Sequence, residues 1–290
     1  MSSTGLSRIL VATDFSPHAD RALEWAAALA RRFSAELEIV TSVFVAPFAA
    51  LPTGYGLPPD YLRGVRDAAD ARLSELSARF ASDGLRVRTT VLHEDPSSGI
   101  CALARERGSD LVALGTRGRA GLAHVLLGSV AERVARLAPC PVLTVHSGVV
   151  PARPLRRLLV PTDFSEPANA ALGLARTLLE PGGALILAHA IPPVVVSGDA
   201  AAPISDPHSE AWARAEFAKI RPTLAGVSAE LDLSYGVADG AVLDAAARHE
   251  ADAIVTGTQG RTGLAHVLLG SVAERVIRRA PLPVFSVKAK

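Results

Sequence analysis

Two kinds of hydrophobic pattern alternate along the chain, and they predict a regular succession of strands and helices. Short runs typical of strands occur at residues 8–13, 36–43, 86–92, 111–115 and 141–145. Stretches with a helical period lie between them, at residues 17–33, 58–83, 98–107 and 128–138. This alternation predicts βαβ crossovers and a mostly parallel five-stranded sheet with helices on both faces.

The whole pattern occurs twice. Residues 115–145 align without a gap with residues 257–287, and the near-identical octapeptides ILVATDFS and LLVPTDFS open the two halves. The second copy repeats the predicted strands, near residues 157–162, 184–190, 230–236, 253–257 and 283–287. The copies meet in a stretch with prolines and a glycine but no amphipathic period. We therefore expect domains at 1–147 and 156–290, joined by a linker at 148–155, and each domain is long enough to bury a core.

Composition and charge exclude several classes of protein. Thirty Lys and Arg residues against 29 Asp and Glu give a net charge of +1, which argues against nucleic-acid binding and gives no reason to expect a membrane surface. Cys101 and Cys140 lack the spacing of a metal site or a disulfide framework. No apolar run reaches the ~20 residues of a membrane span, and residues 1–8 do not resemble a signal peptide. We expect a cytoplasmic protein.

A short polar block follows the first strand of each half. It reads Ala12-Thr13-Asp14 in the first half and Pro161-Thr162-Asp163 in the second. Sheets of this topology bind ligands at the carboxyl ends of their strands, where each aspartate could meet a ligand hydroxyl or a cation. The alternative is an Asx turn or a helix cap. Since Ser16 and Ser165 already fit the cap, we favour a ligand.

A glycine block follows the fourth strand of each half. Its members are Gly115, Gly118, Gly128 and Ser129 in the first half, and Gly257, Gly260, Gly270 and Ser271 in the second. Glycines let backbone N–H groups approach an anion, and a helix N-terminus favours phosphate. The alternative is two glycine turns and a Ser-capped helix. Neither the G-x4-G-K-[ST] pattern nor G-x-G-x-x-G occurs, so the block is neither a P-loop nor a dinucleotide fingerprint.

Together, these blocks and the closing strands APCPVLTV and APLPVFSV resemble the universal stress protein family, and the whole chain resembles its tandem type. The resemblance implies two doubly wound sheets of strand order 3-2-1-4-5, of the adenine-nucleotide α-hydrolase-like class. It also implies one ATP site in each half. Asp14 and Asp163 would lie near the ribose or near a Mg ion bound with the nucleotide.

The resemblance also assigns the other contacts. In the first half, main chain at Ala12, Thr13 and Val43 would border the adenine, while Gly115, Gly118, Gly128, Ser129 and Val130 would hold ribose and phosphates. In the second half, the corresponding residues would be Pro161, Thr162 and Ala190, then Gly257, Gly260, Gly270, Ser271 and Val272. Ala12 departs from the proline usual in the family. Arg117 stands opposite Gln259, and would strengthen phosphate binding in the first site if that position faces phosphates.

Other repeated residues have simpler interpretations. We expect His124 and His266 to pack in loops, and the pairs Glu132–Arg133 and Glu274–Arg275 to be solvated helix charges. Trp25 and Trp212 do not correspond between the copies, which indicates packing. The segments 46–60 and 192–208, rich in Pro and Gly, are candidates for lids or partner surfaces.

Three functions remain open from the sequence. The first is an ATP-binding stress-response regulator, the second a slow ATPase or phosphotransferase, and the third a scaffold that binds no nucleotide. The absence of lysine from both glycine loops favours the first over the second. The closing strands 142–145 and 284–287 end each domain's order and would be exposed edges. The resemblance implies pairing through this strand, as in single-domain relatives, so we expect the two domains to pair there within one chain, with a homodimer of the whole chain as the less certain alternative.

Overall fold

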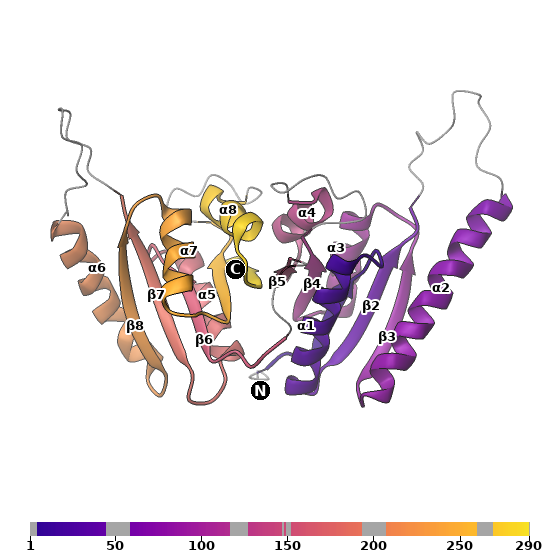
Figure 1. The fold of residues 1–290 in the computed structure, drawn as a ribbon, viewed down its shortest axis with the longest axis horizontal. Coiled ribbons are helices and arrows are strands. Elements are labelled where there is room, and N and C mark those ends of the chain that lie inside the picture. Colours follow the sequence, from indigo (N-terminus) through magenta and orange to yellow (C-terminus); the bar gives the residue numbers. More distant parts are fainter. Residues whose placement is uncertain are drawn as a thin grey trace, which may run out of the picture. The chain divides into compact units, whose positions relative to one another are not determined.

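A computed structural model describes residues 5–44, 59–116, 127–146, 148, 152–192, 207–259 and 269–289 of the chain. The chain divides into two compact units, Met1–Ala152 and Arg153–Lys290. Each unit is an α/β domain built on a parallel sheet (Figure 1). The expected fold class is confirmed.

Unit 1 contains five parallel strands in the order β3-β2-β1-β4-β5. Its elements are β1 (Arg8–Ala12), α1 (Pro17–Phe33), β2 (Glu36–Ser42), α2 (Pro59–Ser82), β3 (Arg86–Leu92), α3 (Pro96–Arg107), β4 (Leu111–Gly115), α4 (Ser129–Leu137) and β5 (Val142–Val145). Because crossovers between parallel strands are right-handed, α1 and α2 cover one face, and α3 and α4 cover the other.

Unit 2 repeats this topology, with strand order β8-β7-β6-β9-β10. Its elements are β6 (Arg157–Pro161), α5 (Glu166–Leu178), β7 (Ala184–Ile191), α6 (Pro207–Ile220), a short 3-10 helix (Arg221–Leu224), β8 (Ser228–Tyr235), α7 (Ala238–Arg248), β9 (Ala253–Gly257), α8 (Ser271–Arg279) and β10 (Val284–Val287). The 3-10 helix was not predicted.

The core of each unit lies on both faces of its central strands. Strands β4 and β9 and the middle of β1 are buried, whereas β3 and β8, at one end of each unit's strand order, are largely half-exposed or exposed. This explains why the central strands read as continuous apolar runs and β3 as an alternating one. Trp25 is only 1% exposed, so its packing role is confirmed. No helix in the described part of the chain has the length and hydropathy needed to cross a membrane.

Two helix starts that differ from expectation bear on the candidate site and its neighbours. Helix α3 begins at Pro96 rather than at residue 98, because Asp95 caps it by accepting a hydrogen bond from the Ser98 amide at 3.0 Å. Helix α4 begins at Ser129, with Gly128 as its cap residue. Ser129 is therefore the first helical residue, and the interpretation as a Ser-capped helix is wrong.

Candidate functional site

The turn that follows the first strand has the same geometry in both units. The amide of Thr13 donates to the Val40 carbonyl at 2.8 Å, and the amide of Thr162 donates to the Ala188 carbonyl at 2.9 Å. Each threonine hydroxyl then accepts the amide of the following phenylalanine. Both phenylalanines, Phe15 and Phe164, have a φ of 62°, which costs of order 1 kcal/mol for a residue with a side chain. Tertiary contacts therefore hold this turn in a conformation that its residues alone would not choose.

Asp14 and Asp163 fix this turn through their side chains. Asp14 Oδ1 accepts the Ser16 amide at 3.1 Å, and Asp163 Oδ1 accepts the Ser165 amide at 3.0 Å. The Asx-turn interpretation is thus confirmed. It does not exclude a ligand, since a carboxylate has several acceptor positions and the turn orients them. The serines differ, because Ser16 caps α1 through the Ala19 amide, whereas the Ser165 hydroxyl donates to Asp163.

The first glycine of each glycine block is required by packing of the neighbouring helix. A Cβ on Gly115 would lie 2.9 Å from the backbone carbonyl of His18, and one on Gly257 would lie 2.7 Å from the Pro167 carbonyl oxygen. The first turns of α1 and α5 therefore press directly on the ends of β4 and β9. This close approach is by itself a structural reason for glycine here, and the predicted ligand contacts of Gly115 and Gly257 stay predictions.

The second half of each glycine block opens a helix. The amide of Gly128 donates to Thr116 O at 2.8 Å, and that of Gly270 donates to Thr258 O at 2.7 Å. Neither cap residue has a side chain to satisfy the N–H groups of the first turn. The helix starts at Ser129 and Ser271 therefore offer N–H groups and a positive dipole end to an acceptor from outside.

In unit 2 these elements enclose a cavity of about 310 Å³. It is lined by all of the predicted second-half residues that the structure describes: Pro161, Thr162, Asp163, Ala190, Gly257, Gly270, Ser271 and Val272. Gln259 also lines it. A volume near 300 Å³ is at the lower end of the range for small-molecule sites. Residues from the first, second and fourth strands thus converge on one cavity at the carboxyl edge of the sheet.

Several sequence predictions lie outside the described residues. They are Arg117, Gly118, His124, Gly260 and His266, together with most of the segments 46–60 and 192–208. The roles assigned to these residues stay predictions.

Sequence reasoning missed several residues of the cavity wall. His189 on β7 lines the cavity, as do Ala238 and Val242 on α7 and Ala168 on α5. The Nδ1 atom of His189 is 2.8 Å from the Thr162 carbonyl oxygen. The available signal was a polar residue next to the end of the second predicted strand. The alanines and Val242 gave no signal, because only tertiary packing distinguishes them from other core residues.

The two residues assigned to the adenine edge are not structural counterparts. The register pairs Ala12 with Val40 in unit 1 and Pro161 with Ala188 in unit 2. Counting onward, Val43 corresponds to Ile191, and Ala190 corresponds to Ser42. Moreover, β2 ends at Ser42, so Val43 lies just beyond the strand, where its amide donates to Leu92 O. The carboxyl edge therefore has to be compared between halves by register.

The repeated arginines of α4 and α8 tie each helix to its neighbour. Arg133 reaches Asp95 at 3.7 Å, and Arg275 reaches Asp239 at 3.4 Å. Arg279 makes a closer contact with Asp239, at 2.5 Å, and Asp239 is only 3% exposed. Arg133 is exposed and Arg275 is partly exposed, as expected of solvated helix charges, but each also has an acidic partner that the sequence did not predict. Hydrogen bonds from the Ser97 hydroxyl and the Ser98 amide lower the pKa of Asp95, with a smaller contribution from Arg133.

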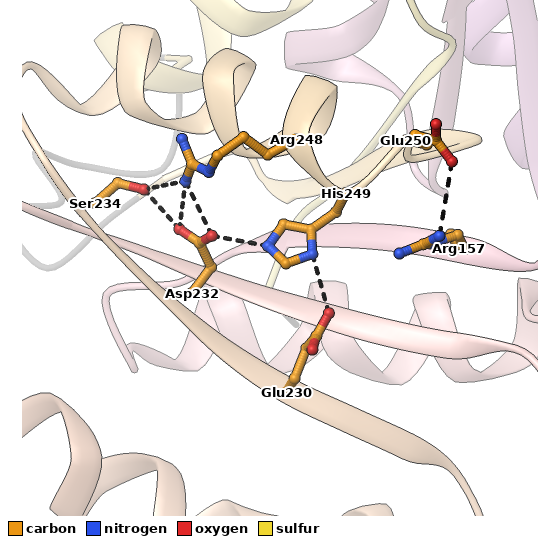
Figure 2. Close-up of polar contacts among 7 residues, drawn as sticks. All are labelled: Arg157, Glu230, Asp232, Ser234, Arg248, His249 and Glu250. Atoms are coloured by element: carbon orange, nitrogen blue, oxygen red, sulfur yellow. Dashed lines mark hydrogen bonds and ion pairs between the residues drawn. The ribbon is translucent and has the colours of Figure 1, made fainter.

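The carboxyl end of α7 is fixed by a polar cluster (Figure 2). Asp232 Oδ2 is 2.8 Å from His249 Nε2, and both carboxylate oxygens accept from Arg248 Nη2 at 2.9 Å. The other ring nitrogen of His249 is 3.0 Å from Glu230. Burial of Asp232 disfavours its ionised form, but hydrogen bonds from Ser234, Arg248 and His249 outweigh burial and lower its pKa. Since Ala238 and Val242 line the cavity, this cluster anchors one of the cavity's walls.

The described acidic, histidine and cysteine side chains do not form a metal site by themselves. Among the described residues, no three His, Cys, Asp or Glu side chains gather closely enough to hold a metal ion. A cation at Asp14 or Asp163 would therefore need further ligands from the molecule bound beside it.

Comparison with known proteins gives a consistent result. The model of the universal stress protein family matches residues 5–146 and again 154–288. Universal stress protein Rv2005c of Mycobacterium tuberculosis is 29% identical over 289 residues, which cover 95% of each chain. Universal stress protein MJ0531 of Methanocaldococcus jannaschii is 34% identical over 140 residues, or 48% of this chain and 81% of that protein. The crystal structure of a universal stress protein from Archaeoglobus fulgidus DSM 4304 covers 100% of both chains with a TM-score of 0.76 at 24% identity, a likeness of fold.

Proposed function

The chain belongs to the universal stress protein family, with one family domain in each half, and we propose that each half binds one ATP. In this proposal the protein is a nucleotide-dependent regulator of a stress response, and binding rather than turnover carries its function. The observation that supports it most is the cavity of unit 2, in which the polar block and the glycine block of the sequence meet.

The described residues of the cavity fit the three parts of ATP. Ala168, Ala188 and Val242 give an apolar surface suited to a purine. The start of α8, at Gly270 and Ser271, offers N–H groups to phosphates, and a Cβ on Gly270 would stand 3.2 Å from the Thr258 carbonyl oxygen. Asp163, oriented by its Asx turn, is the candidate partner for a ribose hydroxyl or a nucleotide-bound Mg ion.

In unit 1 the same roles fall to Ala12, Thr13, Asp14, Gly115, Gly118, Gly128, Ser129 and Val130, with Val43 beside the adenine edge. The turn and helix-start geometry of this half matches that of unit 2 to within 0.1 Å in the corresponding backbone hydrogen bonds described above. We therefore propose two sites of similar construction.

ATP, when bound, supplies the negatively charged triphosphate that the helix starts attract. The residues of the chain would hold it, orient the base against the strand ends and keep water from the apolar side. No lysine lines the described cavity, and no described histidine or carboxylate other than His189 and Asp163 does. Efficient phosphoryl transfer needs a positioned base and concentrated positive charge, so this lining favours a binding role over catalysis.

Titration of nucleotide-free protein with ATP tests the proposal. Calorimetry should give a stoichiometry approaching two per chain, because both halves carry both blocks. A stoichiometry of zero would exclude the ATP assignment. Single-turnover hydrolysis, measured on the same samples, separates the regulator from the slow ATPase or phosphotransferase: conversion of the bound ATP within minutes would favour the enzyme.

We also propose that β5 and β10 pair with each other within one chain, and that whole chains form homodimers. Short apolar strands that end a sheet need cover, and a linker between two domains raises the effective concentration of such a pair. Amide hydrogen exchange should then show protection at 142–145 and 284–287 that persists on dilution. Fast exchange at both strands would contradict the pairing, and sedimentation at increasing concentration tests the homodimer.

A further inference from the structure

One cavity residue distinguishes the second half from the first. His189 lies on β7 and lines the cavity of unit 2. The register aligns Ala188 with Val40, so the residues that follow them, His189 and Thr41, occupy corresponding places. The two halves therefore carry an imidazole and a hydroxyl at the same point of the carboxyl edge.

The hydrogen bond of His189 determines what its ring offers. Its Nδ1 lies 2.8 Å from the carbonyl oxygen of Thr162, and a carbonyl oxygen can only accept. The proton of the neutral ring must then be on Nδ1, which leaves Nε2 as an acceptor. The side chain thus brings a hydrogen-bond acceptor to the wall of a cavity otherwise lined largely by small and apolar residues.

Neighbouring rings restrict how this imidazole can turn. The ring centroids of Phe164 and Trp212 lie 5.3 Å and 5.6 Å from that of His189, and the two rings also meet each other edge-on at 5.4 Å. These rings come from the strand-to-helix turn and from α6. The imidazole is held by packing as well as by its hydrogen bond, so its acceptor is preorganised.

We infer that His189 selects the base at the second site, where its Nε2 accepts a hydrogen bond from the exocyclic amino group of a 6-aminopurine nucleotide. A 6-oxopurine would place one acceptor against another and leave both unpaired in a partly desolvated site. Thr41 has a hydroxyl, which both donates and accepts, so the first site lacks this means of discrimination. The inference rests on the proposed function, because it assigns a role within the same cavity.

The test compares ATP with inosine 5′-triphosphate, in which an oxo group replaces the 6-amino group. Each nucleotide is titrated into the nucleotide-free full chain, in a Trp25→Phe background so that the emission of Trp212 reports on unit 2. Calorimetry on the same samples supplies affinities independently of fluorescence. We expect ATP to bind the second site at least about tenfold more tightly than the inosine nucleotide, the effect of one hydrogen bond.

Two variants assign this preference to His189. His189→Thr introduces the residue of the first half, and His189→Phe keeps a ring against Phe164 and Trp212 but removes both nitrogens. Each should bring the affinity ratio to within about twofold, mainly by weakening ATP binding. His93→Thr is the matched control, since His93 is exposed and lies in the other unit, and it should leave the ratio unchanged.

The outcomes separate the inference from the proposed function. Wild-type protein that binds neither nucleotide overturns the proposed function and this inference with it. Wild-type protein that binds ATP, with the same affinity ratio in the folded His189 variants, overturns the inference alone. So does a wild-type second site that binds both nucleotides equally.

Discussion

At the carboxyl ends of their strands the two halves are nearly the same, whereas at the carboxyl end of the third helix they make one kind of contact with different residues. Both halves place a non-glycine residue at a φ of 62° after the first strand, and both press a helix onto a glycine at the end of the fourth. At this helix end, Arg107 of α3 faces Glu38 in unit 1. At the place of Arg107, unit 2 has His249.

The strand register shows that the carboxylate also lies on a different strand in each half. In unit 1 the carboxylate is Glu38 on the second strand, and Thr90 on the third strand donates to it at 2.8 Å. In unit 2 the residue at the place of Thr90 is Asp232, while an isoleucine replaces the glutamate. A contact between a basic side chain at the end of this helix and a carboxylate on the sheet can thus be built in more than one way. The turn and the helix starts, in contrast, keep the same backbone hydrogen bonds in both halves.

The flanks of the shared turn also differ. Arg72 of α2 lies over the ring of Phe15 at 4.5 Å, whereas Phe164 packs against His189 and Trp212. The strained turn is therefore supported by a cation–π contact in unit 1 and by an aromatic cluster in unit 2. If both turns bind nucleotide, the flanks are where the two sites acquire different affinities.

The largest change in stability should come from adding a methyl group to the glycine that ends the fourth strand of each half. Gly115→Ala and Gly257→Ala would each place Cβ within 2.9 Å of backbone atoms, and we expect each to lower the free energy of unfolding by about 3 kcal/mol. Chemical denaturation measures this loss. Gly64→Ala and Gly173→Ala are the controls in the same units, since nothing lies within 4 Å of their added Cβ, and they should stabilise their helices by about 0.5–1 kcal/mol. Equal effects at both kinds of glycine would contradict the packing argument.

The second comparison concerns the ion pairs that connect the last two helices of each unit, α3 with α4 and α7 with α8. A double-mutant cycle on Asp239 and Arg279 should give a coupling energy of about 2 kcal/mol, because Asp239 is buried. A cycle on Asp95 and Arg133, the pair that connects α3 and α4 in unit 1, should give under about 0.5 kcal/mol, since that pair is half-exposed and 3.7 Å apart. Similar coupling in both halves would show that burial does not set the difference.

The third comparison tests the helix starts. Gly128→Val should weaken ATP binding at the first site by at least about tenfold, because a branched side chain would crowd the phosphates at the first turn of α4. The second site should be unaffected, and Gly270→Val should show the reverse. Calorimetry of each variant measures this. Unchanged stoichiometry and affinity in a folded variant would contradict the phosphate role.

The smallest effect concerns pH. The pKa of Asp232 is lowered in the folded state, so its pairing stabilises unit 2 fully above the usual aspartate pKa of about 3.9, and this stabilisation is lost as the pH falls through the lower folded value. Thr90 at the equivalent place does not titrate in this range. Unfolding followed by Trp212, with Trp25 replaced by Phe, should therefore lose part of its acid sensitivity in Asp232→Asn. If Asp232→Asn and its parent show the same dependence on pH between 6 and 3, this account of Asp232 is wrong.

The sequence allowed most of the secondary structure to be predicted, because apolar runs and helical periods are local signals. Strands β3, β4 and β9 have the predicted limits, and most other strand and helix limits differ by one or two residues. The predicted start of helix α3 is too late because Asp95 is followed by a proline and two serines, a sequence typical of a loop. The topology followed from the alternation of elements and from the family resemblance.

The parts that escaped prediction depend on neighbours distant in sequence. Only the packing of α1 and α5 explains Gly115 and Gly257, and only the folded chain shows that Arg133 and Arg275 reach Asp95 and Asp239. His189 looked like one polar residue within an apolar strand, and its contact with Thr162 arises from strand pairing. Sequence spacing could bring the candidate residues together, but it could not show which atoms each side chain would meet.

A crystal structure of the full chain grown with ATP would test the central claim most directly. The account predicts ATP in both halves, with phosphates on the backbone N–H groups at Ser129–Val130 and Ser271–Val272 and with the base beside Thr13 and Thr162. Electron density for nucleotide elsewhere, or no density at either helix start at ATP concentrations that saturate binding in solution, would contradict it.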